Sequence, residues 1–430
     1  MRLHWIDALK GMGIMLVVFA HHSLPVALDT YIFSFHMPLF FFISGFLFDF
    51  GKYAESAAKF VKGRFRSLIM PYFGFALLTC LFYFLLDTGF QPGVTNIDFF
   101  GNSALYGVYS ILYALGPLIS YNPPLWFLTC LFITELLFYG FARKYYSEPR
   151  KLVLGLTAAG MVGYLYSAYV PFRLPWNADV ALSAVVFYGA GNLFKKIVQL
   201  EETKPREKFG TGSISRSDPR ASGFGSGMRG SDSGSGLRES GFESGLKESG
   251  LRESGLKESG LRESGSRLMG VFLRADKFLP GVFILLNLLY LAYLLEFPSA
   301  EKVNMNVLKY GDFFSYYLLA FSGIFAFVYL FKKIGSSKIL EYYGRNSLIV
   351  LALHFPLKDI LTKLAILGFG VELEYFYYNV VFALSLTLLN LLLLAPVIYL
   401  INTYFPFLVG KKSSSAGFEG LKVYFRKFVN

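Results

Sequence analysis

The sequence predicts an all-α integral membrane protein with about ten transmembrane helices. Of its 430 residues, 54% are hydrophobic and only 16% are charged, and the mean hydropathy is +0.47. A soluble chain averages about 25% charged residues. Ten apolar segments are also long enough to cross a bilayer as helices, which takes roughly 17 to 25 residues.

Six of these segments precede a long polar insertion and four follow it. They are residues 8–27, 33–50, 67–86, 124–142, 152–170 and 178–196, and then 278–296, 313–331, 347–366 and 378–402. The weaker apolar run 105–119 is interrupted by Gly107 and Gly116. We expect this run to be an interfacial or re-entrant part of a long loop.

Lysine and arginine are concentrated in alternate loops, as in membrane proteins whose short cytoplasmic loops collect positive charge. The basic segments are 51–66, 143–151, 332–346 and the tail 411–430, whereas 87–123 and 367–377 have no Lys or Arg. The predicted outer loop 171–177 has only Arg173, and the loop 297–312, with Lys302 and Lys309, is the weakest point of the pattern. Both termini are therefore predicted to be cytoplasmic, in the cytoplasmic membrane of a prokaryote.

The insertion at residues 201–268 is Gly/Ser-rich and repeats units such as LRESG and LKESG from Leu237 to Gly265. Gly and Ser in each unit disfavour a helix, and the low apolar content favours disorder. We expect a disordered cytoplasmic tether between two parts of the membrane core, residues 1–200 and 269–410, with a basic tail at 411–430. A partner-docking role for the tether is left open.

Several function classes find little support in the sequence. The net charge is +12, but no basic patch with interleaved aromatic residues suggests nucleic-acid binding. Cys80 and Cys130 lie in apolar runs, where a thiol acts as a small hydrophobe, and no metal-ligand spacing occurs. The first helix resembles a signal peptide, but no A-x-A cleavage pattern follows it, so it is predicted to remain uncleaved.

Four of the five histidines lie within the first fifty residues, and three of them, His21, His22 and His36, lie inside or at the edge of apolar segments. Ionisable groups inside a membrane are costly and by default mark functional sites. Lys10 and His21 are separated by about three helical turns, or ~16 Å along the axis, which places them on one face. His22 points roughly 100° away from His21.

Residues 6–21, with ten residues between Lys10 and His21, resemble the first helix of the membrane acyltransferases called acyltransferase family 3. Residues 35–48, FHMPLFFFISGFLF, resemble the branch that includes fucose 4-O-acetylase and related sugar O-acetyltransferases. Further matches follow in family order at RFRSLIMPY (64–72), LWFL (125–128) and GRNSLIVLALHFPL (344–357). Many family members have Arg where this chain has Lys10.

The resemblance implies transfer of an acyl group, most simply from acetyl-CoA, to a hydroxyl of a cell-surface polysaccharide or lipid-linked sugar, with no bound cofactor and no metal. His21 would be the general base, since its ordinary pKa is near neutrality. No G-x-S-x-G nucleophile motif occurs, which favours direct transfer. Lys10, Arg64, Arg66 and Arg345 are candidate acyl-CoA ligands. They have a structural alternative as snorkelling anchors or topology-setting charges.

Four further polar residues, His36, Glu135, Asn346 and His354, are candidate substrate-binding residues. Each also has a structural interpretation: a helix cap for His36, a tie between helices for Glu135, and polar packing for Asn346 and His354. The main alternative function is a transporter of a sugar, polyol or lipid-linked glycan, although no internal repeat supports it. A membrane scaffold that presents the tether is a third possibility.

Overall fold

The computed structural model of the protein describes residues 3–89, 104–119, 121–203, 278–297 and 299–411. The chain divides into two compact units, one formed by Met1–Val198 with Asp276–Asn430 and one by Gln199–Ala275. Most of the second unit, and with it nearly all of the predicted tether, lies outside the described residues, as does the tail from residue 412. The helix α8 (Ala178–Thr203) continues to residue 203, so the predicted start of the disordered segment at residue 201 is three residues early.

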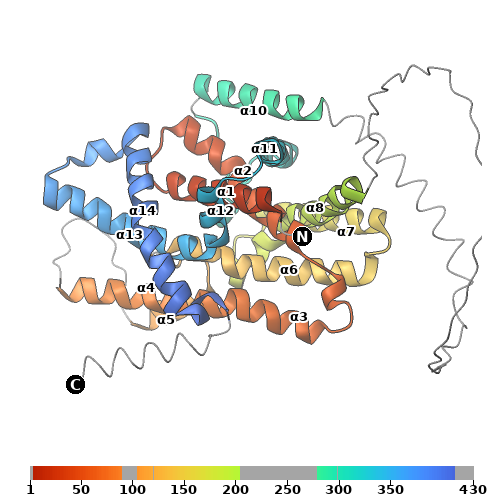
Figure 1. The fold of residues 1–430 in the computed structure, drawn as a ribbon, viewed down its shortest axis with the longest axis horizontal. Coiled ribbons are helices and arrows are strands. Elements are labelled where there is room, and N and C mark those ends of the chain that lie inside the picture. Colours follow the sequence, from red (N-terminus) through yellow and green to blue (C-terminus); the bar gives the residue numbers. More distant parts are fainter. Residues whose placement is uncertain (1–2, 90–103, 120, 204–277, 298, 412–430) are drawn as a thin grey trace, which may run out of the picture. The chain divides into compact units, whose positions relative to one another are not determined.

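Each of the ten predicted spans overlaps an α-helix (Figure 1), but the first two, 8–27 and 33–50, are placed several residues too late in the chain. Besides α8 these are α1 (His4–Ala20), α2 (Val26–Leu47), α4 (Met70–Gly89), α6 (Trp126–Tyr145), α7 (Pro149–Tyr169), α10 (Leu279–Glu296), α11 (Phe313–Ile334), α13 (Ser347–Phe369) and α14 (Val380–Tyr404). Within the described residues there is no strand, and seven helical segments are long and apolar enough to cross a membrane. The predicted class, an all-α integral membrane protein, is confirmed.

Three of the ten spans, α1, α8 and α13, are not among those seven segments. They are shorter or more polar than the others: α1 has 17 residues, and α13 contains Lys358, Asp359 and Lys363. Ionisable residues within transmembrane helices usually face the interior of the bundle and mark functional sites. The two helices α1 and α13 therefore direct attention to the space between them.

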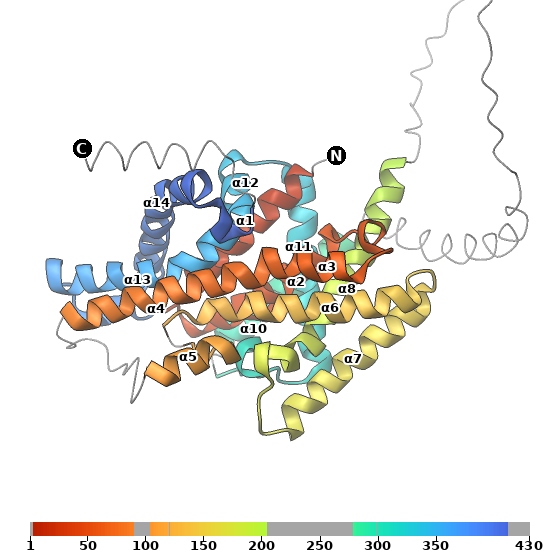
Figure 2. The ribbon, with the colours of Figure 1, turned by 90° about the horizontal axis from the view of Figure 1, so that it is seen from below.

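The segment predicted to be interfacial contains α5 (Ala104–Tyr113). At about 1.5 Å per residue this helix is about 15 Å long, too short to cross a bilayer. A much longer helix runs from α3 (Ala57–Arg64) through the π-helical turn η2 (Phe65–Ile69) into α4. Figure 2 shows it running alongside α6.

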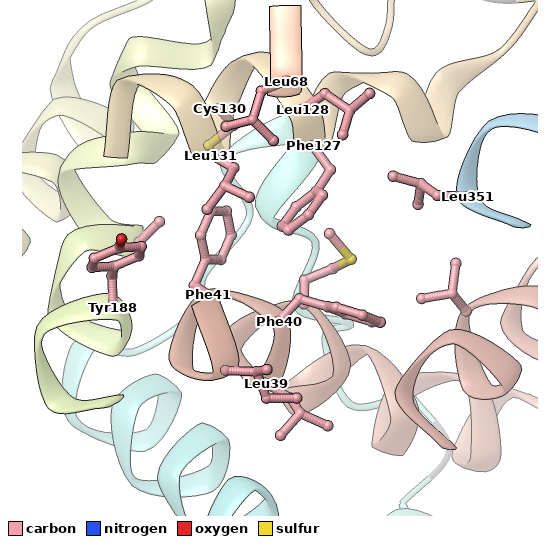
Figure 3. Close-up of a cluster of buried hydrophobic side chains, with 14 of the residues drawn as sticks. Leu39, Phe40, Phe41, Leu68, Phe127, Leu128, Cys130, Leu131, Tyr188 and Leu351 are labelled. Carbon is pink, nitrogen blue, oxygen red and sulfur yellow. The ribbon is translucent and has the colours of Figure 1, made fainter. Parts of the chain in front are cut away.

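An aromatic and aliphatic core fills the space between α2 and α6 (Figure 3). Phe40 and Phe41 of α2 pack on Phe127 of α6, with ring centroids 5.9 and 5.0 Å apart. Leu351 of α13 reaches the same cluster. Since lipid tails are as apolar as these side chains, close van der Waals packing holds the helices together here.

The short helix α12 (Lys338–Arg345) lies beside α1 in Figures 1 and 2. Two glycines allow this approach. A Cβ atom at Gly11 would lie 1.9 Å from the Leu340 carbonyl oxygen, and one at Gly344 would lie 1.9 Å from that of Asp7. Small residues let helix backbones approach closely in membrane proteins. The first half of α1 is thereby fixed in place.

Candidate functional site

A cavity of about 120 Å³ lies at the His21 end of α1, and we call it the histidine cavity. Its walls come from α1, α2, α13, the start of α6 and the loop before α11. The lining residues are Val17, His21, Phe33, His36, Met37, Pro123, Pro124, Trp126, Asn304, Met305, Asn306 and Leu351. Two of the histidines singled out from the first fifty residues thus share one cavity.

His21 is the C-cap residue of α1, and its ring turns back onto the helix. Its Nδ1 lies 2.7 Å from the Val17 carbonyl oxygen. Since a carbonyl oxygen can only accept a hydrogen bond, Nδ1 carries the proton in this contact. Nε2 of the neutral ring is then the nitrogen with a free lone pair, as a general base requires.

The ring of His354 packs edge-to-face against the ring of His21, with centroids 4.9 Å apart and planes at 74°. Its Nδ1 donates to the Val350 carbonyl oxygen over 2.8 Å. Its Nε2 is buried and has no hydrogen-bond partner among the described residues. The fold therefore brings the predicted residue His354 against His21, although His354 does not line the histidine cavity.

His36 is held in the same way, because its Nδ1 donates to the Ile32 carbonyl oxygen over 2.8 Å. The ring of Phe33 contacts His36 edge-on, with centroids 4.9 Å apart. The ammonium group of Lys302 lies 4.0 Å from the centroid of Phe33 and 2.8 Å from a carboxylate oxygen of Asp29. This pairing explains why a lysine occurs in a loop that the charge pattern places outside.

A second cavity, of about 100 Å³, lies at the Lys10 end of α1, and we call it the lysine cavity. Its lining residues are Lys10, Ile14, Met37, Phe40, Ser44, Leu68, Phe127, Leu128, Leu131, Ser347, Leu348 and Leu351. Three of them, Lys10, Ser44 and Ser347, are polar. One cation thus lies in a mostly apolar cavity.

The two cavities follow one face of α1. Successive residues of that face line them in chain order, Lys10 and Ile14 in the lysine cavity and then Val17 and His21 in the histidine cavity. Met37 and Leu351 line both cavities, so the cavities meet at these two side chains. The shared face predicted from the spacing of Lys10 and His21 is therefore present. His22 does not line either cavity.

Arg64 and the buried Glu135 form an ion pair, with Nε 3.1 Å from Oε2. The hydroxyl of Tyr188 donates to Glu135 Oε1 over 3.3 Å. Neither Arg64 nor Glu135 lines the histidine or the lysine cavity. The pair ties α3 to α6 and α8, which is the structural role that the sequence left open for Glu135.

Arg345 lies at the Lys10 end of α1, where two carboxylates engage its guanidinium. One is Asp7, at 3.3 Å, and the other is Glu341. The Nδ1 of His4 lies 3.0 Å from Glu341. The hydrogen bond from His4 lowers the pKa of Glu341 below its ordinary value. The cluster fastens α12 to α1.

The remaining two predicted residues lie outside the cavities. Arg66 is exposed on η2. Asn346 donates to the Tyr342 carbonyl oxygen and accepts a hydrogen bond from Asn402, both over 2.8 Å. This network joins α12, α13 and α14. The next residue, Ser347, lines the lysine cavity.

Sequence reasoning missed the residues where the cavities meet and those of the loop before α11. Met37 and Leu351 look like ordinary core residues in the sequence. The loop residues Asn304 and Asn306 belong to the run VNMNV, whose two amides amid apolar residues were a usable signal. Arg173 donates to the Asn306 carbonyl oxygen over 2.9 Å and so holds this loop against the bundle.

Metal chemistry has no evident site in the part of the chain that the structure describes. No group of three His, Cys, Asp or Glu side chains there is arranged to hold a metal ion. Cys80 and Cys130 are both free thiols.

These features define a multi-helix membrane protein in which a lysine and a histidine on the first helix line two adjoining cavities. A family model described as an acyltransferase domain, that of acyltransferase family 3, matches residues 3–410. The chain belongs to this family, and it is a membrane acyltransferase by that membership. No curated protein and no solved structure matches the chain. The family match covers nearly all of the sequence and does not distinguish branches within the family.

Proposed function

We propose that the protein transfers a short acyl group, most simply acetyl, from cytoplasmic acyl-CoA to a hydroxyl of a cell-surface polysaccharide or its lipid-linked sugar precursor. One observation carries the proposal: Lys10 and His21 share a face of α1 and line two cavities that meet at Met37 and Leu351. The similarity of residues 35–48 to sugar O-acetyltransferases supports a sugar as the acceptor.

The lysine cavity suits the donor. A lysine ammonium is a compact positive charge of the kind that binds phosphate groups, which acyl-CoA carries. The rest of the lining, including Phe40 and Phe127, is apolar and suits an acyl thioester. The concentration of basic loops on one side supports a cytoplasmic approach to the Lys10 end.

The reaction follows from the free nitrogen of His21. Nε2 takes the proton of the acceptor hydroxyl as its oxygen attacks the thioester carbonyl carbon. The new carbon–oxygen bond forms, the carbon–sulfur bond breaks, and the leaving thiolate takes the proton back from His21. The products are an ester and free coenzyme A. His354, packed on the His21 ring, keeps Nε2 aimed at the acceptor.

The decisive experiment uses the full chain in lipid nanodiscs with radiolabelled acetyl-CoA and a glycolipid extract. We expect label in the glycolipid fraction and its loss in His21→Ala. Sugar uptake into proteoliposomes without acyl-CoA, together with no label transfer, would replace the proposal with the transporter alternative. Glycan mass spectrometry of a deletion strain would then identify the acyl group and the acceptor through one missing acyl mass.

A further inference from the structure

A third cavity also touches His21. It has a volume of about 330 Å³ and is more open than the histidine cavity. Its lining combines the turn after α1 (residues 20–24), Val26 and Asp29 of α2, and the pair Tyr377 and Tyr378. We call it the tyrosine cavity. His21 thus lines both the histidine cavity, which adjoins the lysine cavity, and the tyrosine cavity, which shares no lining residue with the lysine cavity.

The two tyrosines are held beside His21 by backbone contacts. The N–H of Tyr378 donates to the Ser23 carbonyl oxygen over 2.9 Å, and Ser23 and Tyr377 form a β-bridge. Tyr378 has φ of +60°, a left-handed conformation that a tyrosine adopts only when its surroundings impose it. The two residues remain exposed, Tyr377 at 49% and Tyr378 at 64%. Each offers an apolar ring face and a hydroxyl, a combination suited to a ligand that is apolar on one side and wet on the other.

Two residues with hydrogen-bonding side chains, Asp29 and His22, line the same cavity. The carboxylate of Asp29 has room for about four hydrogen bonds and uses one oxygen for Lys302, at 2.8 Å. His22 is 8% exposed, and its Nε2 is buried with no hydrogen-bond partner among the described residues. A buried polar atom without a partner is costly, so a ligand group that reached Nε2 from this cavity would remove that cost.

We propose that the tyrosine cavity is the acceptor subsite and that it takes a sugar ring. The C–H face of the sugar packs on Tyr377 and Tyr378, two hydroxyls bond Asp29 and His22, and a further hydroxyl reaches Nε2 of His21. This inference rests on the proposed function, because it assigns the acceptor of that reaction to the second cavity of His21. An apolar alcohol would leave Nε2 of His22 without a hydrogen-bond partner, which disfavours it as the acceptor.

Binding can be tested apart from catalysis. Saturation-transfer NMR on the full chain in nanodiscs, without acyl-CoA, would use the methyl glycosides of glucose, galactose, mannose and fucose as probes. We expect at least one glycoside to receive saturation. Replacing Tyr377 and Tyr378 together by Ala should weaken its binding by about tenfold, the scale of losing aromatic packing. Tyr375→Ala is the matched control, because Tyr375 is equally exposed on the same segment but does not line the cavity.

A second variant separates a loss of binding from a loss of folding. Tyr377→Phe keeps the ring and should keep most of the binding, and the thermal unfolding of each variant should match the wild type. The proposal is overturned if no glycoside binds, or if the double Ala variant binds as well as the wild type. If sugar binding depends on these tyrosines but no acyl group is transferred from acetyl-CoA, the subsite stands and the proposed reaction is rejected. If acyl transfer occurs and the KM for the acceptor is the same in the double Ala variant as in the wild type, the reaction stands and the subsite is rejected.

Discussion

The side-chain amide of Asn122 donates a 2.8 Å hydrogen bond to the main-chain carbonyl of Ala352. Pro356, four residues further along α13, has no N–H to offer that carbonyl, so the asparagine supplies the missing donor. Asn390 of α14 likewise donates to the His354 carbonyl oxygen over 2.9 Å. Two asparagines from outside α13 therefore fix the part of the helix that carries His354.

Asn122→Ala should destabilise the protein by about 1–3 kcal/mol, since it leaves the buried Ala352 carbonyl without this donor. Thermal unfolding in detergent would measure the loss. Pro356→Ala restores an N–H at the position where the helix lacks one. The double variant should therefore recover most of the stability, and strictly additive losses would show that the Asn122 bond does not compensate for the proline.

His21→Ala should lower kcat for acyl transfer by about 10²- to 10⁴-fold, the usual range for a lost general base. His22→Ala should mainly raise the KM for the sugar acceptor and keep most of kcat, because His22 lines only the tyrosine cavity. Initial-rate kinetics with each substrate varied would separate the two effects. A loss of kcat confined to His22→Ala would reverse the assignment of the base.

Lys10→Ala should raise the KM for acyl-CoA with little change in the acceptor KM, because the ammonium is the positive charge in the lysine cavity. Lys10→Arg preserves the charge and should retain activity, as the arginine found in many family members suggests. Lys62→Ala is the control, since Lys62 is exposed on α3 and lines neither cavity. An unchanged KM in Lys10→Ala would leave Lys10 as a membrane anchor.

Leu351→Ala should widen the junction between the lysine and histidine cavities and admit longer acyl chains. The ratio of kcat/KM for butyryl-CoA to that for acetyl-CoA should rise by about 10-fold or more, the discrimination that one or two methylene groups allow. Leu348→Ala is the matched control, because Leu348 lines the lysine cavity alone. Equal ratios in both variants would show that the acyl group does not reach this junction.

The fastening of α12 to α1 should depend on pH through Glu341. Its pKa is lowered in the folded protein, so its contribution to stability is present above the ordinary value of 4.5 and is lost as the pH falls through the lower folded value. Thermal unfolding between about pH 6 and pH 3 should therefore show a smaller decline in Glu341→Gln than in the wild type. Parallel declines would mean that the ionised Glu341 carboxylate adds nothing to the stability.

The positions of the helices and the shared face of Lys10 and His21 could be predicted because both depend only on residues that are close together in the sequence. Hydropathy over about twenty residues locates a span, and the helical repeat of about 3.6 residues places Lys10 and His21 together. Neither argument needs to know which helices are neighbours. The family motif at Lys10 and His21 added the chemistry to that geometry.

Two partners of the charged residues could not be predicted, because they lie far away in the sequence. Arg64 and Arg345 were expected near the acyl-CoA phosphates, yet helix packing brings Glu135 to the first and Asp7 to the second. The other partner of Arg345, Glu341, lies one turn earlier on α12. Met37 and Leu351 gain their position between two cavities only when α2 and α13 meet beside α1. Their side chains carry no polar group that would have marked them.

The position of His21 between two separate cavities has a kinetic consequence. Donor and acceptor would reach the imidazole by different routes, so neither has to depart before the other arrives, and both would be bound together when the proton moves. Reciprocal rate plots at several acceptor concentrations should then intersect and not run parallel. Coenzyme A would then never have to enter the space that the acceptor occupies.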